Sequence, residues 1–131
     1  MAQVLVVDDT EIVRAAVAQV VRRMGHTAVT AATGEDALEA VANSAPDLAL
    51  LDLRMPGMDG AALYQALRSR LGARCPPVVI VSASPPDEVA RRVGTVGLLA
   101  GIVRKPFALD ELVRAIGEAL AAGSPVVAAG A

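Results

Sequence analysis

The sequence contains little that would support a disulfide-stapled or membrane-spanning protein. Its 131 residues include a single cysteine, Cys75, which cannot form an internal disulfide and therefore suits a reducing compartment. No apolar run approaches the roughly 18 residues that a bilayer-spanning helix needs. The N-terminus begins Met1-Ala2-Gln3-Val4 and lacks the basic region of a secretory signal. We therefore expect a cytoplasmic protein that does not enter a membrane.

Aromatic and excess basic residues are also scarce. Tyr64 and Phe107 are the only aromatic residues, so the core must be built from Val, Leu and Ile, within a hydrophobic fraction of 54%. Lys and Arg number 12 against 14 Asp and Glu, which gives a net charge of −2 without any basic tract. Nothing in this balance attracts nucleic acid or anionic lipid. A basic helix-turn-helix segment is also missing, so we expect no direct DNA binding.

Two kinds of segment alternate along the chain. Short, continuous apolar runs are typical of strands that are buried on both faces. They occupy residues 3–7, 27–31, 48–51, 78–81 and 98–103. Segments with helical spacing separate them, and in the first of these one helix face holds Val13, Ala16, Val17, Val20, Val21 and Met24. The expected helices span about 13–24, 33–43, 60–70, 85–93 and 109–120.

Strands that alternate with helices predict an α/β fold in which a parallel sheet is covered on both faces. Right-handed crossovers leave few topologies. We expect a doubly wound, flavodoxin-like (βα)5 arrangement of five strands in the order 2-1-3-4-5. Residues 1–121 are expected to form this one domain. Residues 122–131 are small and uncharged, and we expect a flexible tail there with no effector domain.

Polar residues stand where the apolar runs end, which is where such sheets bind ligands. Asp8 and Asp9 follow the first run, Asp52 the third, Ser82 the fourth and Lys105 the fifth. Converging carboxylates repel one another unless a cation neutralises them, and an all-oxygen site suits Mg²⁺. With the metal bound, Asp52 could stay ionised and attack a phosphorus atom. Lys105 and the metal could stabilise the phosphoryl oxygens, and Ser82 could donate to the attached group.

Each of these residues also has an ordinary structural interpretation. Asp9 could be only the N-cap of the following helix, Ser82 a turn residue and Lys105 a solvated surface residue. Asp52 after four apolar residues is harder to explain in this way, because a buried carboxylate needs partners. The joint occurrence at four strand ends favours a site. His26 has no such context, and we expect it to be structural.

Four motifs in this order resemble the receiver domain of two-component response regulators. The resemblance covers about residues 3–121, and its longest motif, from residue 50 to residue 60, is the most specific. It implies the same (βα)5 fold that the alternating segments predict. The motifs are Val6-Val7-Asp8-Asp9, Leu50-Leu51-Asp52-Leu53-Arg54-Met55-Pro56-Gly57-Met58-Asp59-Gly60, Ser82-Ala83 and Lys105-Pro106-Phe107.

The resemblance implies a phosphorylation site centred on Asp52. This residue would accept a phosphoryl group from the phosphohistidine of a histidine kinase or phosphotransfer protein, or from a small phosphodonor. Asp8 or Asp9, or both, would hold Mg²⁺ together with Asp52 and the backbone carbonyl of Arg54. Phosphoryl transfer and slow autodephosphorylation would be self-catalysed, so we do not expect an enzyme that turns over another substrate.

The resemblance also implies how a signal would leave the site. Ser82 would be the hydroxyl that moves toward the phosphoryl group, and Lys105 would bind that group. The peptide bond between Lys105 and Pro106 would be cis. The chain would be a stand-alone response regulator whose output is a downstream protein bound by the fourth helix, fifth strand and fifth helix. Homodimerisation through the same face stays open.

Three positions depart from the family pattern. Ile102 stands where the family usually has the Tyr or Phe that rotates inward, so we hypothesise that the signal passes through a shift of the fourth helix and its preceding loop. Arg54 could shield the phosphoryl group or contact its donor, or be a solvated surface arginine. Ala108 gives the last helix no capping side chain, which affects stability, while Asp110 and Glu111 complement the helix dipole.

Other functions remain open at this point. An aspartate-nucleophile phosphatase of haloacid-dehalogenase type would also use Asp52, but it usually wants an acid where Arg54 stands. A flavodoxin-like FMN module would need a phosphate loop after the first strand, where Asp8 and Asp9 would instead repel phosphate. A receiver that is never phosphorylated is disfavoured by the intact set of acids, hydroxyl and lysine. A phosphoryl adduct on the wild type that Asp52→Asn does not form would support Asp52 as phosphoacceptor, whereas turnover of a model phosphomonoester with Mg²⁺ would favour the phosphatase.

Overall fold

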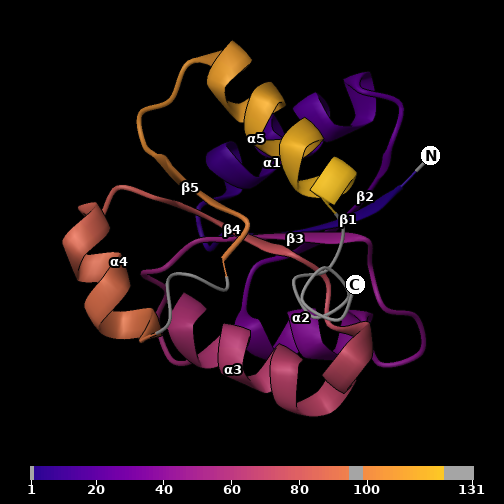
Figure 1. Cartoon of the computed structure of the whole chain (residues 1–131), viewed down its shortest axis with the longest axis vertical. Coiled ribbons are helices and arrows are strands. Elements are labelled where there is room, and N and C mark those ends of the chain that lie inside the picture. Colours follow the sequence, from indigo (N-terminus) through magenta and orange to yellow (C-terminus); the bar gives the residue numbers. More distant parts are fainter. Residues whose placement is uncertain (1, 95–98, 123–131) are drawn as a thin grey trace.

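Strands and helices alternate along the chain in the computed structural model, which describes residues 2–94 and 99–122 (Figure 1). The strands are β1 (Gln3–Val7), β2 (Thr27–Ala31), β3 (Leu48–Leu51), β4 (Val78–Ser82) and β5 (Gly101–Arg104). The helices are α1 (Glu11–Arg23), α2 (Gly34–Ala40), α3 (Gly60–Leu71), α4 (Pro86–Val93) and α5 (Leu109–Ala122), with a short 3-10 turn η1 (Gly72–Arg74). None of the helices in these two ranges is long and apolar enough to cross a membrane.

The strands form one parallel sheet in the order β2-β1-β3-β4-β5, which confirms the predicted topology. Helices α1 and α5 lie on one face, and α2, α3 and α4 lie on the other (Figure 1). Alternate residues of β1 therefore enter two cores. Leu5 and Val7 pack with residues of α2, α3 and α4, whereas Val4 and Val6 pack with residues of α1 and α5. This double burial explains why the strands are continuous apolar runs.

Side-chain caps determine where two of the helices begin. Thr33 Oγ1 accepts a hydrogen bond of 3.0 Å from the Asp36 backbone at the start of α2. Asp59 Oδ1 accepts one of 2.8 Å from Ala62 at the start of α3. Helix α1 begins after Thr10 and has no side-chain cap, so the interpretation of Asp9 as an N-cap is wrong. Such a cap contributes about 0.5–2 kcal/mol.

Most predicted boundaries agree with the structure to within two residues, and two differ more. Helix α2 ends at Ala40 instead of about residue 43, because Asn43 and Ser44 favour non-helical backbone and Pro46 disfavours helix in the residue before it. Strand β5 begins at Gly101, which pairs with Val79 near the start of β4. The predicted start of that strand at residue 98 and the predicted tail beyond residue 122 lie outside the described residues.

Candidate functional site

Backbone hydrogen bonds continue past the ends of the strands and fix the polar residues at one edge of the sheet. The backbone N–H of Asp52 donates to the carbonyl of Val7 at 2.9 Å, so Asp52 still pairs with the neighbouring strand. Lys105 donates in the same way to the carbonyl of Ser82 at 2.9 Å. Strands β1 and β3 are neighbours where the strand order reverses, which places Asp8 beside Asp52.

The three acids predicted from the sequence converge at this edge. Carboxylate oxygens of Asp8, Asp9 and Asp52 all lie within 4.8 Å of one another. Asp8 and Asp52 are only 4% and 7% exposed, while Asp9 is exposed. Two buried carboxylates and a third beside them form an oxygen-only donor set of high negative charge. This set fits a divalent cation, as predicted.

Lys105 reaches into the acid cluster and is not a solvated surface residue. Its Nζ lies 2.7 Å from Asp8 Oδ2 and 3.4 Å from Asp52 Oδ2. The side chain of Lys105 is 18% exposed. One ammonium therefore neutralises part of the charge of two buried carboxylates, and it stands where it could contact a group attached to Asp52.

Burial raises the pKa of the Asp52 carboxyl above its ordinary value. The nearby Lys105 ammonium lowers it, the negative charge of Asp8 raises it, and a backbone hydrogen bond from Arg54 lowers it. The net shift is upward, so the cluster without a bound cation disfavours the ionised form of Asp52. A nucleophilic carboxylate must be ionised, and a cation bound at this cluster would favour that form.

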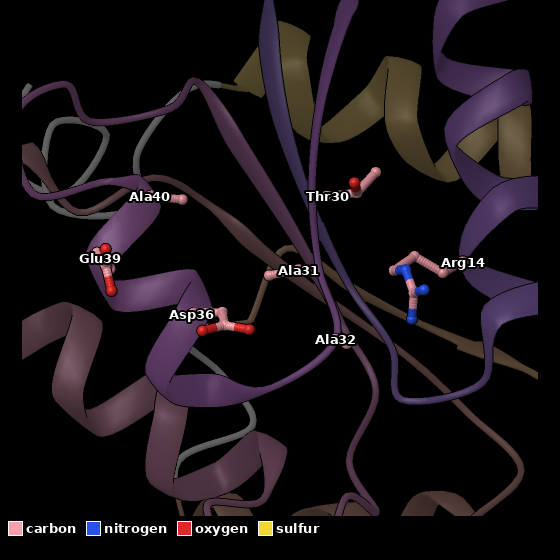
Figure 2. Close-up of a pocket in the computed structure, with 7 residues that line it drawn as sticks. All are labelled: Arg14, Thr30, Ala31, Ala32, Asp36, Glu39 and Ala40. Atoms are coloured by element: carbon pink, nitrogen blue, oxygen red, sulfur yellow. The ribbon is translucent and has the colours of Figure 1, made fainter.

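The loop that carries Asp8 is held by its own hydrogen bonds. The backbone N–H of Thr10 donates to Asp8 Oδ1 at 2.9 Å, and Arg14 Nη1 donates to the Asp8 carbonyl at 2.8 Å. Arg14 also lines an open pocket of about 550 Å³ with Thr30 and Ala31 (Figure 2). Across this pocket from Arg14 lie Asp36 and Glu39 of α2. The role of Arg14 at this edge could not be read from the spacing of the motifs.

Ser82 is the last residue of β4 and is almost completely buried. Its Oγ accepts a hydrogen bond of 3.2 Å from the backbone of Ser84. The hydroxyl therefore lies at the same edge of the sheet as the acids, in a strand and not in a turn. Ser84 Oγ in turn accepts a bond of 3.1 Å from Arg54 Nε.

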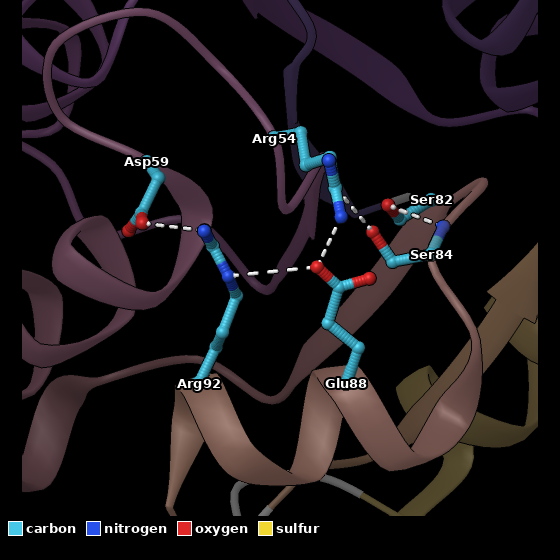
Figure 3. Close-up of polar contacts among 6 residues, drawn as sticks. All are labelled: Arg54, Asp59, Ser82, Ser84, Glu88 and Arg92. Carbon is cyan, nitrogen blue, oxygen red and sulfur yellow. Dashed lines mark hydrogen bonds and ion pairs between the residues drawn. The ribbon is translucent and has the colours of Figure 1, made fainter.

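Arg54 makes contacts that neither sequence-based expectation named. Its side chain is 65% exposed, as expected of a surface arginine, and its guanidinium pairs with Glu88 on α4 and with Ser84 (Figure 3). Arg92 continues this network to Asp59 at 3.0 Å. One feature of the sequence indicated part of this network, namely that Glu88 and Arg92 are four residues apart on a helix.

The remaining predictions at the site concern packing residues. Ile102 is half-buried and packs against the core under α2, α3 and α4, so an aliphatic side chain fills the position of the usual aromatic. The Lys105–Pro106 peptide bond is cis, as predicted. His26 Nδ1 accepts a hydrogen bond of 3.1 Å from the backbone of Ala2, a structural role.

The family of the chain follows from comparison with known proteins. Residues 4–117 match the family model of the response regulator receiver domain. Because this match covers most of the sequence, the chain belongs to the receiver domain family of two-component response regulators. The fold and strand order agree with this membership, which does not favour a phosphatase of haloacid-dehalogenase type.

Individual relatives support the same family. The response regulator MprA of a Mycobacterium species is 36% identical over 126 residues, covering 94% of this chain and 52% of that protein. The gliding motility regulatory protein of Myxococcus xanthus is 36% identical over 114 residues, covering 87% of this chain and 15% of that protein. Thus the chain spans about half of MprA and less of the Myxococcus protein.

Solved structures show the same fold. The chemotaxis protein CheY4 of Vibrio cholerae has a TM-score of 0.82 at 28% identity, covering 91% of this chain and 98% of that one. NtrX from Brucella abortus has a TM-score of 0.81 at 33% identity, covering 92% of this chain and 27% of that one. The receiver fold of this chain therefore resembles both a short chemotaxis protein and part of a longer regulator.

Proposed function

We propose that Asp52 is the phosphoacceptor of this receiver. The observation that supports this most directly is the buried Asp52 carboxylate, which shares the Lys105 ammonium with Asp8 at the switch edge of the sheet. A carboxylate oxygen of Asp52 attacks the phosphorus of a phosphohistidine. The new O–P bond forms as the P–N bond breaks, and the bonding electrons leave with the imidazole nitrogen. Lys105 then pairs with the phosphoryl oxygens.

The acid cluster fits Mg²⁺ by its donor set. Asp8, Asp9 and Asp52 would hold it with the backbone carbonyl of Arg54. Bound there, Mg²⁺ supplies charge neutralisation for the phosphoryl oxygens. Within the protein, the hydrogen bond from Thr10 orients Asp8, and the surrounding fold shields the Asp8 and Asp52 carboxylates from bulk water.

The proposed activity is a switch, not turnover of a substrate. A histidine kinase or phosphotransfer protein supplies the phosphoryl group, and the self-catalysed loss of that group resets the protein. Phosphorylation changes the surface formed by α4, β5 and α5, which binds a downstream protein in the cytoplasm. Ser82 responds first, since its hydroxyl lies at the same sheet edge as Asp52.

Intact-mass measurement after incubation with acetyl phosphate and Mg²⁺ tests the proposal. The wild type is expected to gain one phosphoryl group, and Asp52→Asn is expected to gain none. Asp36→Asn removes an exposed acid outside the cluster and is expected to be phosphorylated like the wild type. An equal adduct on Asp52→Asn, or no adduct on the wild type, would refute the assignment.

A further inference from the structure

A chain of polar contacts fastens α4 to the loop that follows Asp52 (Figure 3). Arg54 in that loop donates to Ser84 Oγ at 3.1 Å and pairs with Glu88 in the first turn of α4. Arg92, one turn further along α4, lies 3.8 Å from Glu88 and 3.0 Å from Asp59. The pairing of Arg54 with Glu88 joins α4 to the loop, and the pairing of Arg92 with Asp59 joins it to the start of α3.

Apolar packing holds α4 only weakly. The helix has eight residues, and Val89 and Val93 are the ones that are buried. By comparison, α3 buries six of its twelve residues. Since few apolar groups fix α4, the pairing of Arg54 with Glu88 adds the modest contribution of a partly exposed ion pair to what holds its N-terminal end.

Arg54 lies in the loop that directly follows Asp52, so a phosphoryl group on Asp52 would be a competing partner for it. It follows Asp52 by two residues, and its side chain is 65% exposed, whereas that of Glu88 is 14% exposed. The other partner of the guanidinium, Ser84, donates its backbone N–H to the Ser82 hydroxyl at 3.2 Å. One side chain thus connects the loop after the phosphoacceptor with the loop after the switch hydroxyl.

The charges of this network balance as they stand. Arg54 and Arg92 are matched by Glu88 and Asp59. A phosphoryl group would add close to two negative charges and three acceptor oxygens beside Arg54. A guanidinium binds such a group in a bidentate manner and more strongly than a single carboxylate oxygen. The added group therefore changes which partner of Arg54 is favoured.

We propose that Arg54 is an exchangeable latch on α4, a device that deepens the proposed function and rests on it. In the unphosphorylated protein Arg54 holds the N-terminal end of α4 through Glu88 and Ser84. Phosphorylation of Asp52 draws the guanidinium to the phosphoryl oxygens and frees Glu88. The contact between Arg92 and Asp59 keeps α4 attached to α3, so the helix shifts without detaching. This exchange of ion pairs takes the place of the aromatic rotation that Ile102 does not provide.

Amide hydrogen exchange over residues 84–93, measured with and without excess acetyl phosphate and Mg²⁺, tests the latch. Phosphorylation of the wild type is expected to speed exchange there roughly twofold to fivefold, the range that one partly exposed ion pair supports. Glu88→Gln frees Arg54 in advance. The amide protons of this variant are therefore expected to exchange fast without acetyl phosphate, and phosphorylation is expected to speed their exchange little.

Asp87→Asn is the matched control. It also removes an acid from the first turn of α4, but Asp87 is exposed and lies outside the network, so wild-type exchange is expected in both states. Intact mass on each sample reports phosphorylation separately. An absent wild-type adduct overturns the proposed function. An adduct without faster exchange, or equal exchange in Glu88→Gln and Asp87→Asn before phosphorylation, overturns the latch alone.

Discussion

At the scale of single residues, Gly60 lies in close contact with the backbone of Asp52, the proposed phosphoacceptor. A Cβ at Gly60 would lie 2.2 Å from the Asp52 carbonyl oxygen and 2.8 Å from Leu53 Cα. Its backbone N–H also donates to the Leu53 carbonyl at 2.8 Å. The first residue of α3 therefore presses directly on the backbone of Asp52, and only glycine fits there.

Gly60→Ala should destabilise the protein by about 1–3 kcal/mol, because backbone atoms must move to make room for the methyl group. The same movement displaces Asp52, so slower phosphorylation is expected as well. Gly117→Ala is the control. Gly117 lies in α5 with open space around it, so alanine there should stabilise the protein by about 0.5–1 kcal/mol. Urea unfolding followed by circular dichroism measures both. Wild-type stability in Gly60→Ala would contradict the close approach.

At the scale of secondary-structure elements, α3 and α4 differ in how firmly they are anchored. Six residues of α3 and two of α4 are buried, although both helices cover the same face of the sheet. Local opening costs less free energy where fewer apolar contacts break. Amide protons of α4 should therefore exchange through openings of lower free energy than those of α3 in the unphosphorylated protein. Residue-resolved exchange by NMR measures this, and equal protection of the two helices would contradict it.

Most helices and strands could be predicted from the sequence. Strands that are buried on both faces are continuous apolar runs, and such runs are typical of a parallel sheet covered by helices. The first three strands have their predicted bounds. The edge strand β5 was less well predicted, because the apolar run begins before Gly101, which is the first residue that pairs with β4. Helix α2 was predicted too long because apolar spacing does not record where polar residues favour a turn.

The site was predictable where strand ends determine it, and not where side chains cross between loops. Asp8, Asp52 and Lys105 converge because parallel strands end at one edge. Lys105 carried a further signal, since it is the only lysine among 12 basic residues. The partners of Arg54 lie 30 and 34 residues away in the sequence, at Ser84 and Glu88. Contacts between side chains so far apart in the sequence cannot be predicted from its periodicity.

At the scale of the whole molecule, the raised pKa of Asp52 connects the site with the stability of the fold. The folded protein binds the Asp52 proton more tightly than the unfolded chain does. Stability therefore falls as the pH rises from the ordinary Asp range, about 4, through the raised pKa. Asp52→Asn removes this loss, while Lys105 keeps its ion pair with Asp8.

In EDTA, Asp52→Asn should therefore be more stable than the wild type at pH 7, and the difference should shrink toward zero below about pH 4. Urea unfolding at several pH values measures it by circular dichroism, since the chain has no tryptophan. Asp36→Asn changes an exposed acid and should follow the wild type at each pH. A wild type that is more stable than Asp52→Asn at neutral pH without metal would contradict the upward shift.

Cation binding should stabilise the whole molecule, because the acid cluster joins β1 and β3 and exists only in the folded state. A ligand bound only by the folded state adds about 2.7 kcal/mol at a hundred times its Kd. Mg²⁺ should therefore raise the free energy of unfolding of the wild type progressively. Asp9 is exposed and does not cap α1, so Asp9→Asn should change the stability in EDTA little.

The same variant should lose much of the Mg²⁺ response, since one of the three carboxylates is gone. Asp36→Asn should keep that response in full, because Asp36 lies on α2 outside the cluster. Urea unfolding of the three proteins across a Mg²⁺ titration gives both quantities from one experiment. If Asp9→Asn keeps the wild-type increase, Asp9 is not a ligand and the metal is held by Asp8, Asp52 and the Arg54 carbonyl without it.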